Sequence, residues 1–125
     1  GAGKAATLLS ACLWLRNARI VYWGDCDEAG YGILSSLRGQ FPQVRSSLMD
    51  LAAWNRWKHL AVKGRRDPTV THENLTTVER SALESAIAGP WMIEQEVVPP
   101  HIADAAIERA FIEDDSGELS SHQIR

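Results

Sequence analysis

The chain has few cysteines, no excess of positive charge and no long apolar run. Each of these features argues against a class of protein. Only two of its 125 residues are cysteines, and Cys12 and Cys26 follow different patterns, so no disulfide framework is indicated. Thirteen Lys and Arg against 16 Asp and Glu give a net charge of −3, which argues against a constitutive polyanion binder but permits a local basic patch. Without a membrane-spanning run or a signal-peptide pattern, we expect a cytoplasmic protein that does not enter a membrane.

The composition fits one domain with a hydrophobic core, since 45% of the residues are hydrophobic and 23% are charged. We expect this domain to span residues 1–111 and to be followed by a polar, disordered tail over residues 112–125. The chain begins Gly-Ala-Gly without a Met at the entry to an expected helix. This start predicts a fragment of a longer protein.

Helical and strand patterns alternate along the chain. Helices are expected over residues 5–16, 29–40, 51–60, 76–88 and 99–111, strands over 19–23 and 44–49, and a loop over 61–74. In the 29–40 helix, Ile33, Leu34 and Leu37 are expected to share the core face. This alternation predicts an α/β fold, a parallel sheet flanked by helices, with its functional site at the carboxyl ends of the strands.

The most informative stretch is IVYWGDCDEAG at positions 20–30, in which a strand leads into an Asp-x-Asp pair. Alternate carboxylates at the end of a buried strand cost desolvation and repel each other, and a divalent cation normally offsets that cost. With the period of a strand, Asp25 and Asp27 point to one side while Cys26 points away and packs. Because Mg²⁺ prefers oxygen ligands, we expect Mg²⁺-dependent chemistry at this pair.

Three other interpretations of the pair were weighed. An EF-hand loop is rejected, because Ala29 and Ser36 stand where calcium ligands are needed. A haloacid-dehalogenase-type phosphatase also places Asp-x-Asp after an apolar strand, although its usual turn and its later Lys before an acidic pair are not evident. In the structural alternative, Asp27 caps the next helix and Asp25 is a strand-end carboxylate. The phosphatase and structural interpretations stay open.

The first residues, GAGK, do not form a Walker A motif, because Ala5 rather than Ser or Thr follows Lys4. We expect them to form a loop and a helix N-terminus beside the carboxylates. There, Gly3 permits close approach and backbone N–H groups meet a phosphate.

Two further groups of charged residues are candidates for the site. Glu94 and Glu96, again at alternate positions, are either a second carboxylate pair near the metal or a solvated strand end. A basic run in or beside the expected loop consists of Lys58, Lys63, Arg65 and Arg66. It is either a phosphate-contacting loop or an ordinary solvated loop. The residues expected to bind DNA are Lys4, Lys63, Arg65 and Arg66.

In their order and flanks, these motifs resemble the Toprim domain of the JetD family. The resemblance rests on Gly-x-Gly before an apolar helix ending Trp-Leu-Arg, Tyr-Trp-Gly-Asp-x-Asp-x-x-Gly, Pro-Gln-Val-Arg-Ser-x-Leu-Met-Asp, and Glu-Gln-Glu before a helix. It covers about residues 1–111. It implies a Toprim-like parallel sheet and metal-dependent DNA cleavage by the nuclease subunit of Wadjet, a condensin-like bacterial system that acts against plasmids.

The resemblance also implies roles for single residues. Asp25 and Asp27 would bind Mg²⁺ or Mn²⁺. Gly24 and Gly30 would allow close approach and the turn into the next helix. Glu-Gln-Glu at positions 94–96 favours a catalytic role for both glutamates.

The implied partners are DNA and the condensin-like subunits of the defence system, and a homodimer is left open. The family's third ligand is a glutamate upstream of Gly-x-Gly, where this chain has no residue. We therefore expect the chain alone to bind metal weakly and to cleave little DNA. The non-enzymatic alternative is a Toprim-like module that docks onto the condensin-like partners without a metal.

Overall fold

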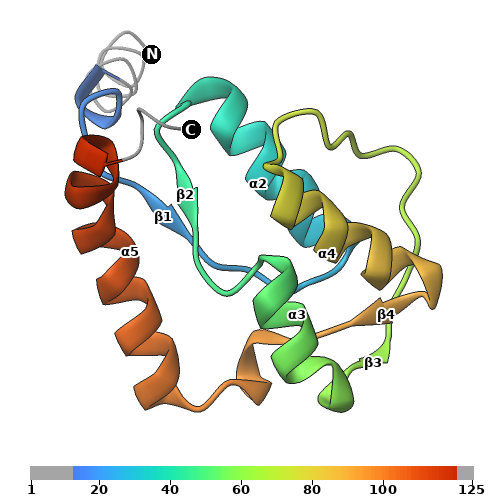
Figure 1. The fold of residues 1–125 in the computed structure, drawn as a ribbon. Helices are drawn as coiled ribbons and strands as arrows, with labels where there is room; N and C mark the ends of the chain where they lie inside the picture. Colours follow the sequence, from blue (N-terminus) through green and yellow to red (C-terminus); the bar gives the residue numbers. More distant parts are fainter. Residues whose placement is uncertain (1–12, 121–125) are drawn as a thin grey trace, which may run out of the picture.

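The computed structural model describes the backbone of residues 13–120 and the side chains up to residue 112. Its elements, with η marking 3₁₀ helices, are β1 (Val21–Tyr22), α2 (Glu28–Gln40), β2 (Arg45–Ser46), α3 (Leu51–Trp57), η1 (Lys58–Leu60), β3 (Val62–Lys63), α4 (Thr77–Ala88), β4 (Trp91–Met92), η2 (Gln95–Val97) and α5 (Pro100–Ser120). The predicted α/β class is confirmed (Figure 1). Most of the helix expected over 5–16 lies outside the described residues. None of the described helices has the length and hydropathy that crossing a bilayer requires.

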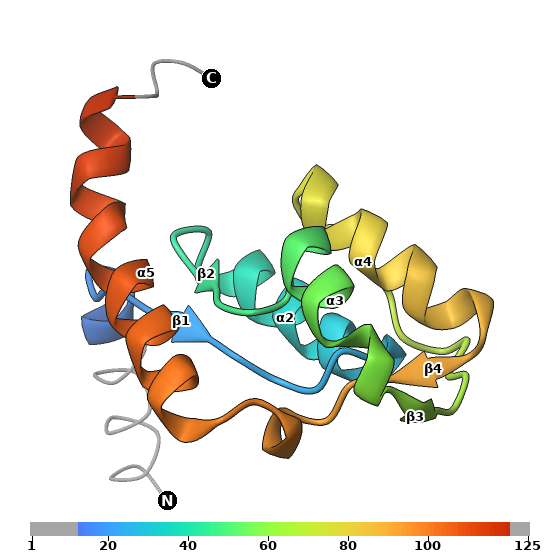
Figure 2. The ribbon, with the colours of Figure 1, turned by 60° about the horizontal axis from the view of Figure 1, so that its bottom comes forward.

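The strands form two short pairs instead of one sheet. β1 and β2 are parallel, with Val21 opposite Arg45 and Tyr22 opposite Ser46. β3 and β4 are antiparallel and lie at the end of the molecule away from α5 (Figure 2). The prediction of a parallel sheet therefore holds for β1 and β2 only. The prediction of a loop over 61–74 was wrong for β3. This strand pairs with β4, which follows α4 in the chain, so the sequence near β3 carries no strand pattern.

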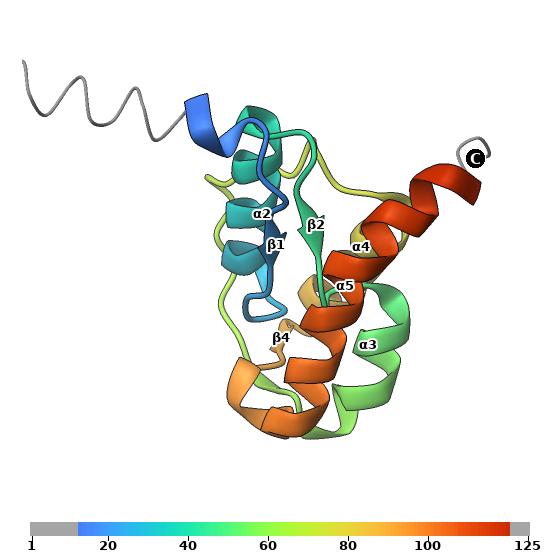
Figure 3. The ribbon, with the colours of Figure 1, turned by 90° about the vertical axis from the view of Figure 1, so that its left-hand side faces the viewer.

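The core lies where α2, α3 and α4 meet the β1–β2 pair, while α2 and α5 lie on opposite sides of that pair (Figure 3). Tyr31 and Leu34 of α2 and Met49 after β2 have no exposed surface. The expectation that Ile33 shares this face was wrong, since its side chain is 56% exposed. With 3.6 residues per turn, the core face of α2 follows Tyr31, Leu34 and Ser35, and Ile33 lies on nearly the opposite side of the helix, roughly 150° from the centre of that face.

Three helices begin directly after a capping residue, within one residue of their expected starts. Asp27 caps α2 by accepting from Gly30 N, and Asp50 caps α3 by accepting from Ala53 N. In α4, Thr76 and Glu79 form a reciprocal capping box. These side chains satisfy N–H groups that have no partner within the helix.

The last helix, α5, begins at Pro100 as predicted and contacts β1. Its buried face consists of Ala103, Ala106 and Ala110. The helix continues past the expected end at Phe111 to Ser120, and Gly117 does not end it. Residues 121–125, the rest of the expected tail, lie outside the described part.

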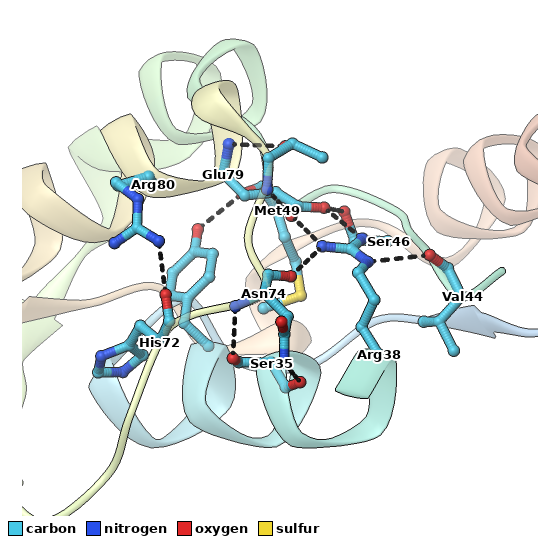
Figure 4. A network of polar contacts seen from close by, with 11 residues as sticks. Ser35, Arg38, Val44, Ser46, Met49, His72, Asn74, Glu79 and Arg80 are labelled. Carbon is cyan, nitrogen blue, oxygen red and sulfur yellow. Dashed lines mark hydrogen bonds and ion pairs between the residues drawn. The ribbon is translucent and has the colours of Figure 1, made fainter. Parts of the chain in front are cut away.

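A buried ion pair joins α2, β2 and α4 (Figure 4). Glu79 is 3% exposed, and Arg38 donates two hydrogen bonds of 2.6 and 2.9 Å to its carboxylate. Ser46 Oγ and Thr76 N also donate to Glu79. Burial raises the pKa of Glu79, but the hydrogen bonds from Arg38, Ser46 and Thr76 outweigh burial and hold this pKa below its ordinary value. The carboxylate is therefore ionised at neutral pH.

Candidate functional site

The Asp-x-Asp pair lies in a tight turn between β1 and α2. Asp27 N donates to Asp25 O at 3.0 Å, so the chain turns directly into the helix. Asp27 Oδ1 accepts from Gly30 N at 2.7 Å, and Asp25 Oδ1 accepts from Gln95 N at 2.9 Å. Both residues are half-buried, and neither carboxylate has an ion-pair partner among the described side chains. The capping role weighed for Asp27 is therefore present, and the carboxylates keep oxygens that are not used by these bonds.

Two glycines shape this turn. A Cβ at Gly30 would collide with the carbonyl oxygen of Asp25, and it would lie 3.1 Å from Asp27 Oδ1. A Cβ at Gly24 would collide with the Tyr22 hydroxyl. The backbone of Asp25 leaves no room for a Cβ at Gly30, whereas at Gly24 the nearest atoms belong to a side chain. The roles of both glycines in the approach of a phosphate stay predictions.

The residue between the aspartates belongs to the core. Cys26 is 4% exposed, its thiol donates to Leu48 O at 3.5 Å, and its backbone bridges to Ile93. Burial raises the pKa of the Cys26 thiol to about 11. The thiol therefore stays protonated at neutral pH, which confirms a packing role.

The carboxylates of Asp25 and Asp27 bring two negative charges into a half-buried environment. Burial raises the pKa of Asp27, the Gly30 N–H opposes this rise, and the charge of Asp25 adds to it. Burial also raises the pKa of Tyr22, and both aspartates raise it further. A cation between the two carboxylates would relieve this repulsion.

A distant segment, residues 94–96, lies against the pair. Gln95 donates its backbone N–H to Asp25 and its side-chain amide to Trp23 O at 2.8 Å. Its chain neighbours are Glu94, which precedes η2, and Glu96 within η2. Among the described side chains, however, no three of His, Cys, Asp or Glu converge as metal ligands. The catalytic roles of both glutamates stay predictions.

A family model described as Wadjet protein JetD, C-terminal, matches residues 1–107. The chain belongs to the JetD family. A search of curated proteins finds no match. The resemblance to JetD is thereby confirmed, and membership points to a role in Wadjet and to partners within that system.

The basic residues of this JetD-family chain occupy different environments. Lys63 on β3 and Arg65 are exposed. Arg66 is also exposed but pairs with buried Glu28 through Nε at 2.8 Å, and its role in DNA binding stays a prediction. Gly3 and Lys4 lie outside the described residues.

Glu28 anchors the loop of residues 64–76, between β3 and α4, to the first turn of α2. Its Oε1 also accepts from Asp67 N at 2.7 Å, and its carbonyl oxygen lies 3.0 Å from His72 Nε2. The hydrogen bond from Arg66, helped by the one from Asp67 N, holds the pKa of Glu28 below its ordinary value although burial opposes this. Sequence analysis missed this anchor because Glu28 and Arg66 are 38 residues apart.

Neighbouring arginines in this loop should therefore differ in their effect on stability. Arg66→Ala is expected to lower the free energy of unfolding by about 1 kcal/mol, the upper end for a half-exposed ion pair. Arg65→Ala removes the same charge from an exposed side chain and should cost less than about 0.5 kcal/mol. Urea unfolding followed by circular dichroism measures both. Equal losses would contradict the anchoring role of Arg66.

Proposed function

We propose that this chain carries the metal-binding carboxylates of a domain that cleaves DNA within Wadjet. One observation carries the proposal: Asp25 and Asp27 stand together where β1 turns into α2, without a cationic partner among the described residues. Membership of the JetD family supports the same conclusion. A Toprim-like arrangement of the sheet is part of the proposal, and the parallel β1–β2 pair is compatible with it.

The donor set suits Mg²⁺ or Mn²⁺. Backbone N–H groups of Gln95 and Gly30 each occupy one carboxylate oxygen and orient the pair, which leaves other oxygens of Asp25 and Asp27 to hold the ion. Mg²⁺ keeps several waters and is often held by one or two carboxylates together with substrate phosphates. When bound, the ion supplies positive charge to a phosphate undergoing cleavage. Glu94 and Glu96 are proposed to act beside the pair, and Lys63 and Arg65 to contact DNA.

The test separates metal binding from helix capping. In NMR titrations of the chain with Mn²⁺, the amide signals of residues 24–30 and of Gln95 should broaden. Asp27→Asn keeps a good capping side chain but removes a charge, and it should weaken Mn²⁺ binding about tenfold or more. Asp50→Asn is the matched control, because Asp50 caps α3 with a 2.9 Å bond to Ala53 N but has no carboxylate two residues away. It should bind Mn²⁺ within about twofold of the parent.

Each other outcome points to a specific alternative. Unchanged binding by Asp27→Asn would reduce Asp27 to a helix cap and remove the main support for the nuclease. No broadening in the parent chain would favour the metal-free interaction module. Metal-dependent hydrolysis of an aryl phosphate without plasmid nicking would favour the phosphatase.

A further inference from the structure

A polar cleft of about 280 Å³ lies between the loop after β2, α3 and α5, and neither Asp25 nor Asp27 lines it. Figure 1 labels the elements that border it. Arg56 comes from α3 and Arg109 from α5. The small side chains of Ala52 and Ala106 leave room between the two helices. At about 30 Å³ per water, the volume admits a phosphate group with several waters.

Hydrogen-bond donors exceed acceptors in this cleft. Arg56 stacks over the Trp57 indole, 4.9 Å from the ring centroid, and Arg109 contacts no acceptor among the described residues. The indole N–H of Trp57 is buried and also lacks an acceptor within the described part. The single carboxylate lining the cleft, Asp50, already accepts from Ala53 N.

The charge of the residues that line the cleft also favours an anion as the ligand. Two guanidinium groups face one carboxylate in this cleft, although the chain as a whole has a net charge of −3. Arg56 and Arg109 are exposed, whereas the Trp57 indole N–H is a buried donor without an acceptor among the described residues. A buried donor without an acceptor is costly, and an anion with several acceptor oxygens would satisfy it together with the two guanidinium groups. Guanidinium groups bind phosphate oxygens through paired N–H bonds.

Each wall of the cleft is connected to the Asp25–Asp27 turn through a hydrogen bond of its own or of the segment before it. On one wall, Leu48 O accepts from the Cys26 thiol, between the two aspartates. Leu48 has a φ of 59°, a conformation rare for a non-glycine residue that persists only where its surroundings hold it. The other wall, α5, follows η2, in which Gln95 donates to Asp25. A group bound in the cleft would therefore lie on structure continuous with the pair.

We propose that the cleft binds a backbone phosphate of DNA through Arg56 and Arg109. That the ligand is DNA rests on the proposed function. That the ligand is an anion rests on the residues that line the cleft. The site positions the nucleic acid by its backbone and does not select its sequence.

The experiment measures affinity for a fluorescent 20-base-pair duplex by anisotropy at several salt concentrations, in EDTA. Arg56→Gln and Arg109→Gln should each weaken binding about fivefold and reduce the slope of log K against log salt by about 0.9, the value for one phosphate contact. Arg16→Gln is the control, since Arg16 is exposed, lies outside the basic run and does not line the cleft. Circular dichroism checks that each variant is folded.

Because EDTA removes the metal, this result does not depend on the Asp25–Asp27 pair. Parent-like affinity and slope in both arginine variants would overturn the proposal, as would the absence of duplex binding by the parent at low salt. Equal losses of DNA affinity in all three variants would indicate nonspecific electrostatic attraction between the chain and DNA. That result would also overturn the proposal. A parallel NMR titration with inorganic phosphate identifies the source. Shifts of the Leu48 and Arg109 amides by phosphate, without an effect of the variants on DNA affinity, would exclude DNA as the ligand.

Discussion

Replacing Glu79 by alanine is expected to lower the free energy of unfolding by about 3–5 kcal/mol, because it leaves a buried guanidinium without its partner. The side chain of Arg38 is only 14% exposed, so water cannot fully replace the lost carboxylate. Glu84→Ala is the control: Glu84 lies on the same helix but is exposed, and its loss should cost less than about 0.5 kcal/mol. Urea unfolding at neutral pH compares the two variants. Similar losses would contradict the structural role of the Arg38–Glu79 pair.

The loss should also depend on pH. The pKa of Glu79 in the folded chain lies below the ordinary 4.5, so the folded carboxylate binds its proton less readily than the unfolded one. Its ionised form therefore contributes stability that is fully present above pH 4.5 and is lost as pH falls through the folded pKa. The stability gap between the parent and Glu79→Ala should narrow from about pH 6 to about pH 3. A constant gap over this range would mean that the charge of Glu79 does not matter.

Gly30→Ala is expected to destabilise the chain by about 3 kcal/mol, against the usual preference of helices for alanine. The added Cβ would meet the backbone carbonyl of Asp25, which cannot rotate away as a flexible side chain would. Relief requires the first turn of α2 to move, and that movement breaks the bond from Gly30 N to Asp27. The expected change is therefore a lower melting temperature together with altered amide shifts over residues 24–30.

Gly39→Ala supplies the matched comparison within the same helix. Gly39 is exposed, and a Cβ there would meet only the amide nitrogen of Asn74, at 3.0 Å. Alanine at this position should change stability by less than about 1 kcal/mol, in either direction. If Gly30→Ala proved as mild as Gly39→Ala, the close approach at the Asp25 carbonyl would not be a constraint on the turn.

Features encoded within a few residues could be predicted from the sequence. The start of α4 follows from Thr76 and Glu79, and the turn at the aspartate pair follows from Asp27 and Gly30, because each contact spans three residues. The spacing of Asp25 and Asp27 marked the candidate site for the same reason. Local hydrogen-bonding groups and steric limits are sufficient in these cases.

Contacts between distant residues could not be predicted in this way. Glu79 completes a local helix cap, but its ion-pair partner Arg38 is 41 residues away. The bond between Gln95 and Asp25 spans 70 residues, and the pairing of β3 with β4 crosses all of α4. The ion pair between Arg66 and Glu28 spans 38 residues. These features depend on how helices pack, which one sequence pattern does not determine.

The position of Glu28 links a surface loop to the candidate metal site. Glu28 follows Asp27 directly, and its side chain and carbonyl oxygen hold Arg66, Asp67 and His72 of the 64–76 loop. A protein that binds this loop would thus act, one peptide bond away, on the backbone that orients the Asp27 carboxylate. A change in the loop is therefore expected to reach the first turn of α2, in which the Asp27 carboxylate accepts from Gly30 N.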